Sequence, residues 1–173
     1  MIFIVATIGA VITVLAFLSK RSSGVAVTTN DMPNADIPED VGLNPDNNFD
    51  TRIILFARAI ASAEGFGHAG AIPTKYHNPG DLKPVDGTAA YYTGQSGVGD
   101  GGHAIFLNDL SGWNALYRQV RLMATNKSHI YNTQMSIFDV GIHYAEDSSN
   151  WAKNVAQFLG VSTETTLQEF FYG

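Results

Sequence analysis

Residues 61–82 read ASAEGFGHAGAIPTKYHNPGDL, and this stretch places one acid, Glu64, at the end of a predicted helix. Asp50 is the expected N-cap of that helix. Apolar residues recur behind it at helical spacing, at Ile53, Phe56, Ala57 and Ile60. Glu64 continues this inward stripe one turn later, and Gly65 and Gly67 are expected to end the helix.

The position of Glu64 favours the protonated form of its carboxyl group. The end of a helix carries the negative pole of the helix dipole, and the neighbours of Glu64 on the stripe are apolar, with Phe66 beside it. An acid that is protonated near neutral pH can donate its proton to a leaving-group oxygen, as cleavage of a glycosidic bond requires. The alternative interpretation is a surface glutamate in the last turn of a helix.

The rest of the C-terminal part predicts a mainly helical domain with one small β-hairpin. Residues 89–93 and 103–107 are strand-like, and the glycine-rich residues 94–102 between them are expected to form a mobile loop. Further helices are predicted from Asn108 or Asp109, from Ser136, and from Ser149 or Asn150 to Gly160. A last short helix presents Leu167, Phe170 and Phe171.

The order of these motifs resembles a known family. Ala61-x-x-Glu64-Gly65 is followed by His77-Asn78-Pro79-Gly80-Asp81-Leu82, then by Ala104-Ile105-Phe106, by a helix with Gly112–Leu116, and by Tyr144 ahead of Asn150–Ala156. This arrangement is similar to the lysozyme-like lytic transglycosylases and related phage muramidase domains. The resemblance covers most of residues 50–171 and none of the first fifty. Asp81 departs from the family pattern, which usually has asparagine there.

The resemblance implies a mainly α (α+β, lysozyme-like) fold and cleavage of the MurNAc–GlcNAc bond of peptidoglycan, with no cofactor and no metal. Glu64 would act as the single catalytic acid: it protonates the glycosidic oxygen and then, as a carboxylate, removes the proton of the C6 hydroxyl, which leaves a 1,6-anhydro end. The expected substrate-binding residues are Tyr76, Asn78, Phe106 and Tyr144. Packing roles for Tyr76 and Phe106, and a turn-holding role for Asn78, are the alternatives.

Three other functions stay open at this point. A hydrolase needs a second acid, for which Asp81, Asp86 and Asp100 are candidates. A zinc peptidase that cuts peptidoglycan cross-links could use the His77-x3-Asp81 spacing with other histidines (His68, His103, His129 and His143), although no His-x-His or His-Glu-x-x-His pattern is present. A non-catalytic virion protein, structural or glycan-binding, is the third, because a fold does not guarantee activity.

An apolar run, Ile2–Leu18, opens the chain and is free of charged residues. As a helix its 17 residues would be about 25 Å long, close to the thickness of the hydrocarbon core of a membrane. A signal peptide would carry a positive residue before the run and a small-x-small cleavage site after it, and neither is evident. We therefore expect a transmembrane anchor at 1–21, a flexible linker at 22–48, rich in Ser, Gly, Thr, Asn and Pro, and a catalytic domain at 49–173.

The placement of Lys20 and Arg21 bears on location. Basic residues directly after a span are typical of its cytoplasmic side, which conflicts with a wall-degrading enzyme in an ordinary cell membrane. The expected location is therefore the inner membrane of a lipid-containing bacteriophage virion, where Ile2–Leu18 binds the bilayer, other virion membrane proteins are potential partners, and the enzyme opens the wall for genome entry. A bacterial inner membrane, with the domain in the periplasm, is the alternative.

Composition excludes some partners. Without residues 1–21 the chain has eight basic and sixteen acidic residues, a net charge of −8, which argues against nucleic acid as a ligand and also against electrostatic capture by the anionic cell wall. The chain has no cysteine, so disulfides and thiol chemistry are absent.

Overall fold

The computed structural model describes residues 47–173, and the predicted anchor at 1–21 and almost all of the predicted linker at 22–48 lie outside them. The last two linker residues belong to the folded domain, because Asn47 caps the first helix and Asn48 begins it. Within residues 47–173, no helix has the length and apolar character needed to cross a membrane.

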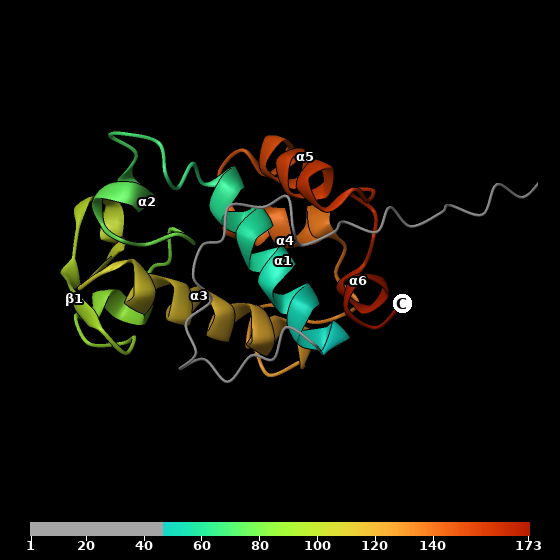
Figure 1. Ribbon diagram of the computed structural model, residues 1–173, viewed down its shortest axis with the longest axis horizontal. Helices are drawn as coiled ribbons and strands as arrows, with labels where there is room; N and C mark the ends of the chain where they lie inside the picture. Colours follow the sequence, from blue (N-terminus) through green and yellow to red (C-terminus); the bar gives the residue numbers. More distant parts are fainter. Residues whose placement is uncertain (1–46) are drawn as a thin grey trace, which may run out of the picture. The chain divides into compact units, whose positions relative to one another are not determined.

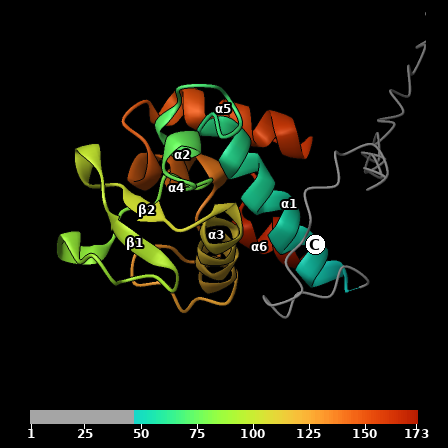
Figure 2. The same cartoon turned by 60° about the vertical axis from the view of Figure 1, so that its left-hand side comes forward.

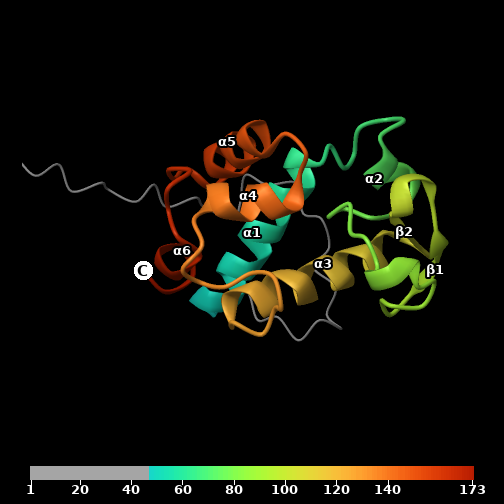
Figure 3. The same cartoon turned by 180° about the vertical axis from the view of Figure 1, so that it is seen from behind.

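Helix α1 (Asn48–Ala63) lies at the centre of the domain (Figure 1). It packs against α3 (Asp109–Ala124), α5 (Ser148–Leu159) and α6 (Leu167–Tyr172), while α4 (Ile137–Tyr144) packs beside α5 (Figure 3). Because partners surround α1, its buried apolar residues exceed a single stripe: they are Ile53, Ile54, Phe56, Ala57, Ala59, Ile60 and Ala61. The predicted mainly helical, α+β character of the domain is confirmed.

Several predicted helix boundaries are confirmed. The Asn108 side chain caps α3 by accepting a hydrogen bond from Ser111 N at 2.9 Å. Ser136 and Asp139 form a reciprocal capping box at the start of α4. Gly160 ends α5 in the left-handed conformation, at φ 68°, that glycine adopts without steric cost.

Two predicted caps are wrong. Asn47, and not Asp50, caps α1, because the Asp50 carboxylate is buried and paired with Arg121 of α3 at 2.9 Å. Asp147, and not Ser149 or Asn150, caps α5, where its Oδ1 accepts from Asn150 N at 3.1 Å. In both cases the helix begins at least one residue earlier than the apolar pattern indicates.

A small β-region lies beside the N-terminal end of α3 (Figure 2). It holds α2 (Ile72–Lys75), two 3-10 turns, η3 (Val85–Gly87) and η4 (Asp100–Gly102), and the antiparallel strands β1 (Gln95–Val98) and β2 (Ala104–Phe106). The hairpin and its second strand are confirmed. Its first strand, predicted at 89–93, is wrong: the strand falls inside the glycine-rich segment predicted to be a mobile loop.

The Gln95 side chain explains this difference. Its Oε1 accepts hydrogen bonds from the backbone N–H groups of Tyr91 and Tyr92, both at 3.1 Å, and its Nε2 donates to the carbonyl oxygens of Thr88 and Gly97, both at 3.0 Å. One side chain thus takes the place of a neighbouring strand for residues 88–92. Gly99 follows β1 at a close approach, since a Cβ there would lie 2.4 Å from the ring of Tyr76.

Candidate active site

Glu64 is held by the way in which α1 ends. It is the C-cap residue, and Gly65 follows in the left-handed conformation at φ 77°. Gly65 N donates to Ser62 O and Phe66 N donates to Ala61 O, the pair of bonds of a Schellman motif. The predicted role of Gly65 in stopping the helix is confirmed, and the motif fixes the backbone that carries the Glu64 carboxyl group.

Glu64 is half-buried, and its carboxyl group accepts one short hydrogen bond. Trp151 Nε1, on α5, donates to Glu64 Oε1 at 2.7 Å. Burial raises the pKa of Glu64 from 4.5 to about 7, the Trp151 hydrogen bond opposes this rise, and the negative charge of Asp81 adds to it. Glu64 is therefore able to hold a proton near neutral pH and to release it there.

Tyr144 supports this acid indirectly. Its ring stacks on the ring of Trp151 with 4.9 Å between centroids, and its hydroxyl donates to Gly80 O at 2.7 Å. Burial raises the pKa of Tyr144 well above 10, and the charge of Glu64 raises it further, so the hydroxyl stays protonated. Tyr144 thus holds Trp151 in place for its bond to Glu64 and joins α4 to the turn at Gly80.

The turn at residues 77–82 is fixed from within by Asn78. This side chain is fully buried, its Nδ2 donates to the carbonyl oxygens of Leu82 and Ala104 at 2.9 and 3.0 Å, and its Oδ1 accepts from Leu82 N at 2.8 Å. The turn also presses on α3, since a Cβ on Gly112 would lie 1.9 Å from His77 O. These contacts favour the turn-holding role of Asn78 over hydrogen bonding to an N-acetyl group.

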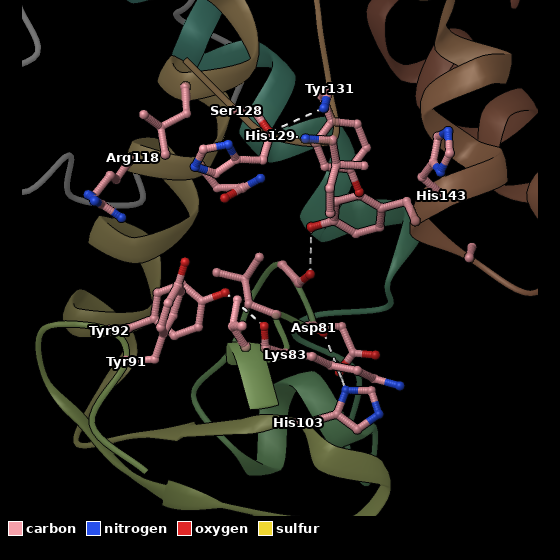
Figure 4. Close-up of a pocket in the computed structure, with 18 of the residues that line it drawn as sticks. Asp81, Lys83, Tyr91, Tyr92, His103, Arg118, Ser128, His129, Tyr131 and His143 are labelled. Atoms are coloured by element: carbon pink, nitrogen blue, oxygen red, sulfur yellow. Dashed lines mark hydrogen bonds and ion pairs between the residues drawn. The ribbon is translucent and has the colours of Figure 1, made fainter. Parts of the chain in front are cut away.

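A cleft of about 750 Å³ runs past Glu64 between the β-region and the helices (Figure 4). Its acids are Glu64, Asp81 and Glu146, and its tyrosines are Tyr91, Tyr92, Tyr131 and Tyr144. Tyr91 and Tyr92 lie on the wall opposite Arg118 and His129 in Figure 4. The volume of the cleft suits a small molecule or a short segment of a polymer.

The cleft brings together three of the predicted site residues, namely Glu64, Asp81 and Tyr144. Tyr76 and Phe106 do not line it. Phe106 is 1% exposed in the core, and the Tyr76 hydroxyl, beneath η4, donates to Asp100 Oδ2 at 3.0 Å. For both residues the structure favours the packing alternative.

Of the candidates for a second acid, Asp81 shares the cleft with Glu64. Its Oδ1 lies 2.8 Å from Nδ1 of His103 as an ion pair. Burial raises the pKa of Asp81, while the nearby His103 and Lys83 charges lower it, and the net direction is upward.

The other two candidates for a second acid are Asp100 and Asp86. Asp100 is not placed beside Glu64 in the cleft: it accepts a hydrogen bond from Tyr76 and lies 4.0 Å from the Lys75 ammonium group. Asp86 lies in η3 and stays a sequence-based candidate.

The histidines do not gather as a zinc peptidase would require. His77 Nδ1 lies 2.6 Å from Asp109 Oδ1, so His77 and Asp81 of the His-x3-Asp spacing have different partners. Within residues 47–173 no cluster of three or more histidine and acidic side chains is arranged to hold a metal ion.

Sequence reasoning missed two residues that act on the acids. Among the sequence-based predictions, Trp151 appears only as part of the Asn150–Ala156 motif, and His103 appears only among the histidines that could bind zinc. The indole N–H of a buried tryptophan needs an acceptor, which is a signal that a site is near, but the acceptor is 87 residues away in the chain. Likewise, only the fold brings His103 to Asp81.

Comparison of the chain with family models, with curated proteins and with solved structures finds no match in any of the three.

Proposed function

We propose that this protein is a peptidoglycan lytic transglycosylase with a lysozyme-like fold, in which Glu64 is the single general acid and base. The observation that carries the proposal is a glutamic acid with a pKa of about 7, which borders the cleft and accepts a hydrogen bond at one oxygen from the Trp151 indole. The described residues provide no hydrogen bond to the other oxygen, Oε2, which leaves it to carry the proton.

The proposed reaction uses this proton twice. Protonated Glu64 gives its proton to the oxygen between MurNAc and GlcNAc, and the bond from that oxygen to C1 of MurNAc breaks. The resulting carboxylate then takes the proton of the C6 hydroxyl of the same MurNAc, O6 bonds to C1, and the 1,6-anhydro ring closes with Glu64 again protonated. Trp151 stabilises the carboxylate between the two steps, and the negative charge of Asp81 favours the cationic character that develops at C1.

A muramidase that uses water is the second candidate, and Asp81 is the observation in its favour. It is an acid in the same cleft as Glu64, close enough for its charge to act on the Glu64 carboxyl. The pairing of Asp81 with His103 argues for a supporting charge over a free base. The two functions differ in their products, because hydrolysis leaves a reducing end.

The cellular setting is part of the proposal. The apolar run Ile2–Leu18 and the Lys20-Arg21 pair after it support an anchored enzyme, for which the inner membrane of a lipid-containing virion fits better than a bacterial inner membrane. In that setting the enzyme would open the cell wall locally during genome entry.

The test is digestion of purified peptidoglycan by the full chain in detergent micelles, followed by mass spectrometry of the fragments. Anhydro ends, each lighter by one water than a reducing end, are expected with the parent chain and should be lost in Glu64→Gln. Glu164→Gln is the matched control, because Glu164 is an exposed acid on the loop between α5 and α6. Reducing ends would favour the muramidase, and intact glycan strands would favour a non-catalytic protein.

A further inference from the structure

The distribution of positive charge over the domain is uneven. Residues 47–173 contain eight lysines and arginines. Four of them are engaged: Arg52 with the C-terminal carbonyl oxygens, Arg58 with Tyr117, Lys75 with Asp100, and Arg121 with Asp50. The side chains of the other four, Lys83, Arg118, Lys127 and Lys153, make no hydrogen bond or ion pair within the described part of the chain.

Three of these four line the same cleft. We name Lys83, Arg118 and Lys127 the basic rim. Arg118 is on α3, Lys127 lies on the loop that follows α3, and Lys83 lies on the opposite wall, in the β-region (Figure 4). These three cations make no ion pair among the described residues, and they offer donors to an anionic ligand along a cleft that also holds the acids Glu64, Asp81 and Glu146.

The loop that carries Lys127 is fixed by its own side chains. At its base, Asn126 Nδ2 donates to Thr133 Oγ1 at 3.1 Å, and Thr133 N donates back to Asn126 Oδ1 at 2.8 Å. In the middle, Ser128 Oγ accepts from the backbone N–H groups of Ile130 and Tyr131 at 3.3 and 3.2 Å. These bonds hold the loop against the cleft, so little ordering is needed when a ligand binds.

The opposite wall is fixed in the same way. Gln95 binds the backbone of Tyr91 and Tyr92, and the Tyr92 hydroxyl donates to Lys83 O at 3.0 Å. Burial raises the pKa of Tyr92 to about 12, so its hydroxyl stays protonated and keeps this bond to Lys83 O. Arg118 and Lys127 therefore share the cleft with Tyr91, which is exposed, and with Tyr92, which is half-buried.

We propose that the basic rim is a carboxylate-binding subsite, so that the enzyme selects glycan that bears carboxylates over neutral glycan. This inference rests on the proposed function for the identity of the polymer. Peptidoglycan offers carboxylates from two sources: the stem peptides, and the lactyl group of MurNAc once its peptide has been removed. Arginine and lysine donors recognise either source, whereas a polymer of GlcNAc alone has no carboxylate. The net negative charge of the chain therefore does not exclude electrostatic binding to the wall, because the cations gather at the cleft.

The test measures binding, in the Glu64→Gln background of the full chain, so that no cleavage is needed. Three ligands are compared: intact sacculi, sacculi glycan stripped of peptides by an amidase, and N-acetylchitohexaose. The variants are R118Q/K127Q, its charge-retaining counterpart R118K/K127R, and K153Q, which removes an unpaired lysine outside the cleft.

R118Q/K127Q loses two exposed ion pairs to ligand carboxylates, so its binding to intact sacculi should be roughly tenfold weaker than that of the parent. This difference should be smaller at high salt, which screens the ion pairs. Binding of N-acetylchitohexaose should stay unchanged, and R118K/K127R and K153Q should bind like the parent. If R118Q/K127Q also binds amidase-treated glycan more weakly than the parent does, the basic rim binds the lactyl carboxylate. If the difference is confined to intact sacculi, the basic rim binds the carboxylates of the stem peptides.

Equal weakening on all three ligands, no weakening on sacculi, or an equal effect in K153Q would overturn the inference. This binding test and the cleavage test of the proposed function can succeed or fail independently. Carboxylate-dependent binding by a parent chain that does not cleave glycan would refute the enzyme and keep the subsite, while cleavage without carboxylate dependence would do the reverse.

Discussion

Replacement of Trp151 by Phe isolates the one hydrogen bond that residues 47–173 make to the Glu64 carboxyl group. Phe keeps a ring to stack on Tyr144 but has no N–H to donate to Glu64 Oε1, which now accepts at 2.7 Å. Because this bond stabilises the ionised form, its loss should raise the pKa of Glu64 above the present value of about 7.

The size of the shift follows from the strength of the bond. A hydrogen bond to a charged group contributes about 1.5–3 kcal/mol, and one pKa unit corresponds to about 1.36 kcal/mol. The full loss would therefore raise the pKa by about one to two units. Since Glu64 borders an open cleft, water can partly replace the indole, and we expect a value near the lower limit, about one unit.

The assay is the pH dependence of kcat/KM for glycan cleavage, whose alkaline limb reports the ionisation of the general acid in the free enzyme. In Trp151→Phe this limb should move to higher pH by about one unit. Trp113→Phe is the matched control, because Trp113 packs against Phe66 and Tyr117 without a hydrogen bond to Glu64 among the described residues. A limb that stays in place, or that moves to lower pH, would refute the assigned role of Trp151. Titration of the Glu64 carboxyl by carbon-13 NMR gives the same answer without turnover.

Three further outcomes are expected. Glu64 keeps its proton up to about pH 7 in the folded state, whereas the unfolded chain releases it near pH 4.5. The free energy of unfolding of the parent, relative to that of Glu64→Gln, should therefore fall by about 3 kcal/mol between pH 4 and pH 8 in urea titrations, and a constant difference would contradict this. Gly112→Ala should lower the unfolding free energy by about 3 kcal/mol or more, measured by thermal melting, since its Cβ would overlap His77 O; an unchanged melting temperature would contradict the close packing of the turn on α3. EDTA should leave glycan cleavage unchanged, whereas loss of activity restored by zinc would favour a metallopeptidase.

The position of Glu64 could be predicted because every signal for it is local. The helical stripe, the acid that continues it and the glycine that ends it all fall within residues 50–65, and the Schellman motif uses backbone bonds that span five residues at most. The Ser136–Asp139 capping box is equally local. Short-range periodicity and capping chemistry are what a single sequence conveys best.

The rest of the site depends on contacts between distant residues. The Gln95 side chain replaces a strand partner for Tyr91 and Tyr92, and no propensity of residues 89–93 reveals this. Tyr76 and Phe106 have the residue type of a sugar platform, but Phe106 is buried in the core on β2 and Tyr76 is buried beneath η4. Tyr91 and Tyr92 instead reach the cleft from a loop. Residue type alone does not separate an aromatic that packs from one that lines a cleft.

The contacts around Glu64 suit a residue that must both give and take a proton. Burial alone would push its pKa above 7, and an acid with too high a pKa could protonate the leaving group only as a poor donor. The Trp151 bond opposes that rise, and Tyr144, fixed on Gly80, keeps Trp151 in position. The His103 ion pair limits in turn the negative charge that Asp81 presents to Glu64. In the proposed single-acid mechanism these opposing effects keep the pKa near the working pH, where donation in the first step and acceptance in the second are both favourable; a hydrolase with a separate base would not need that balance at one residue.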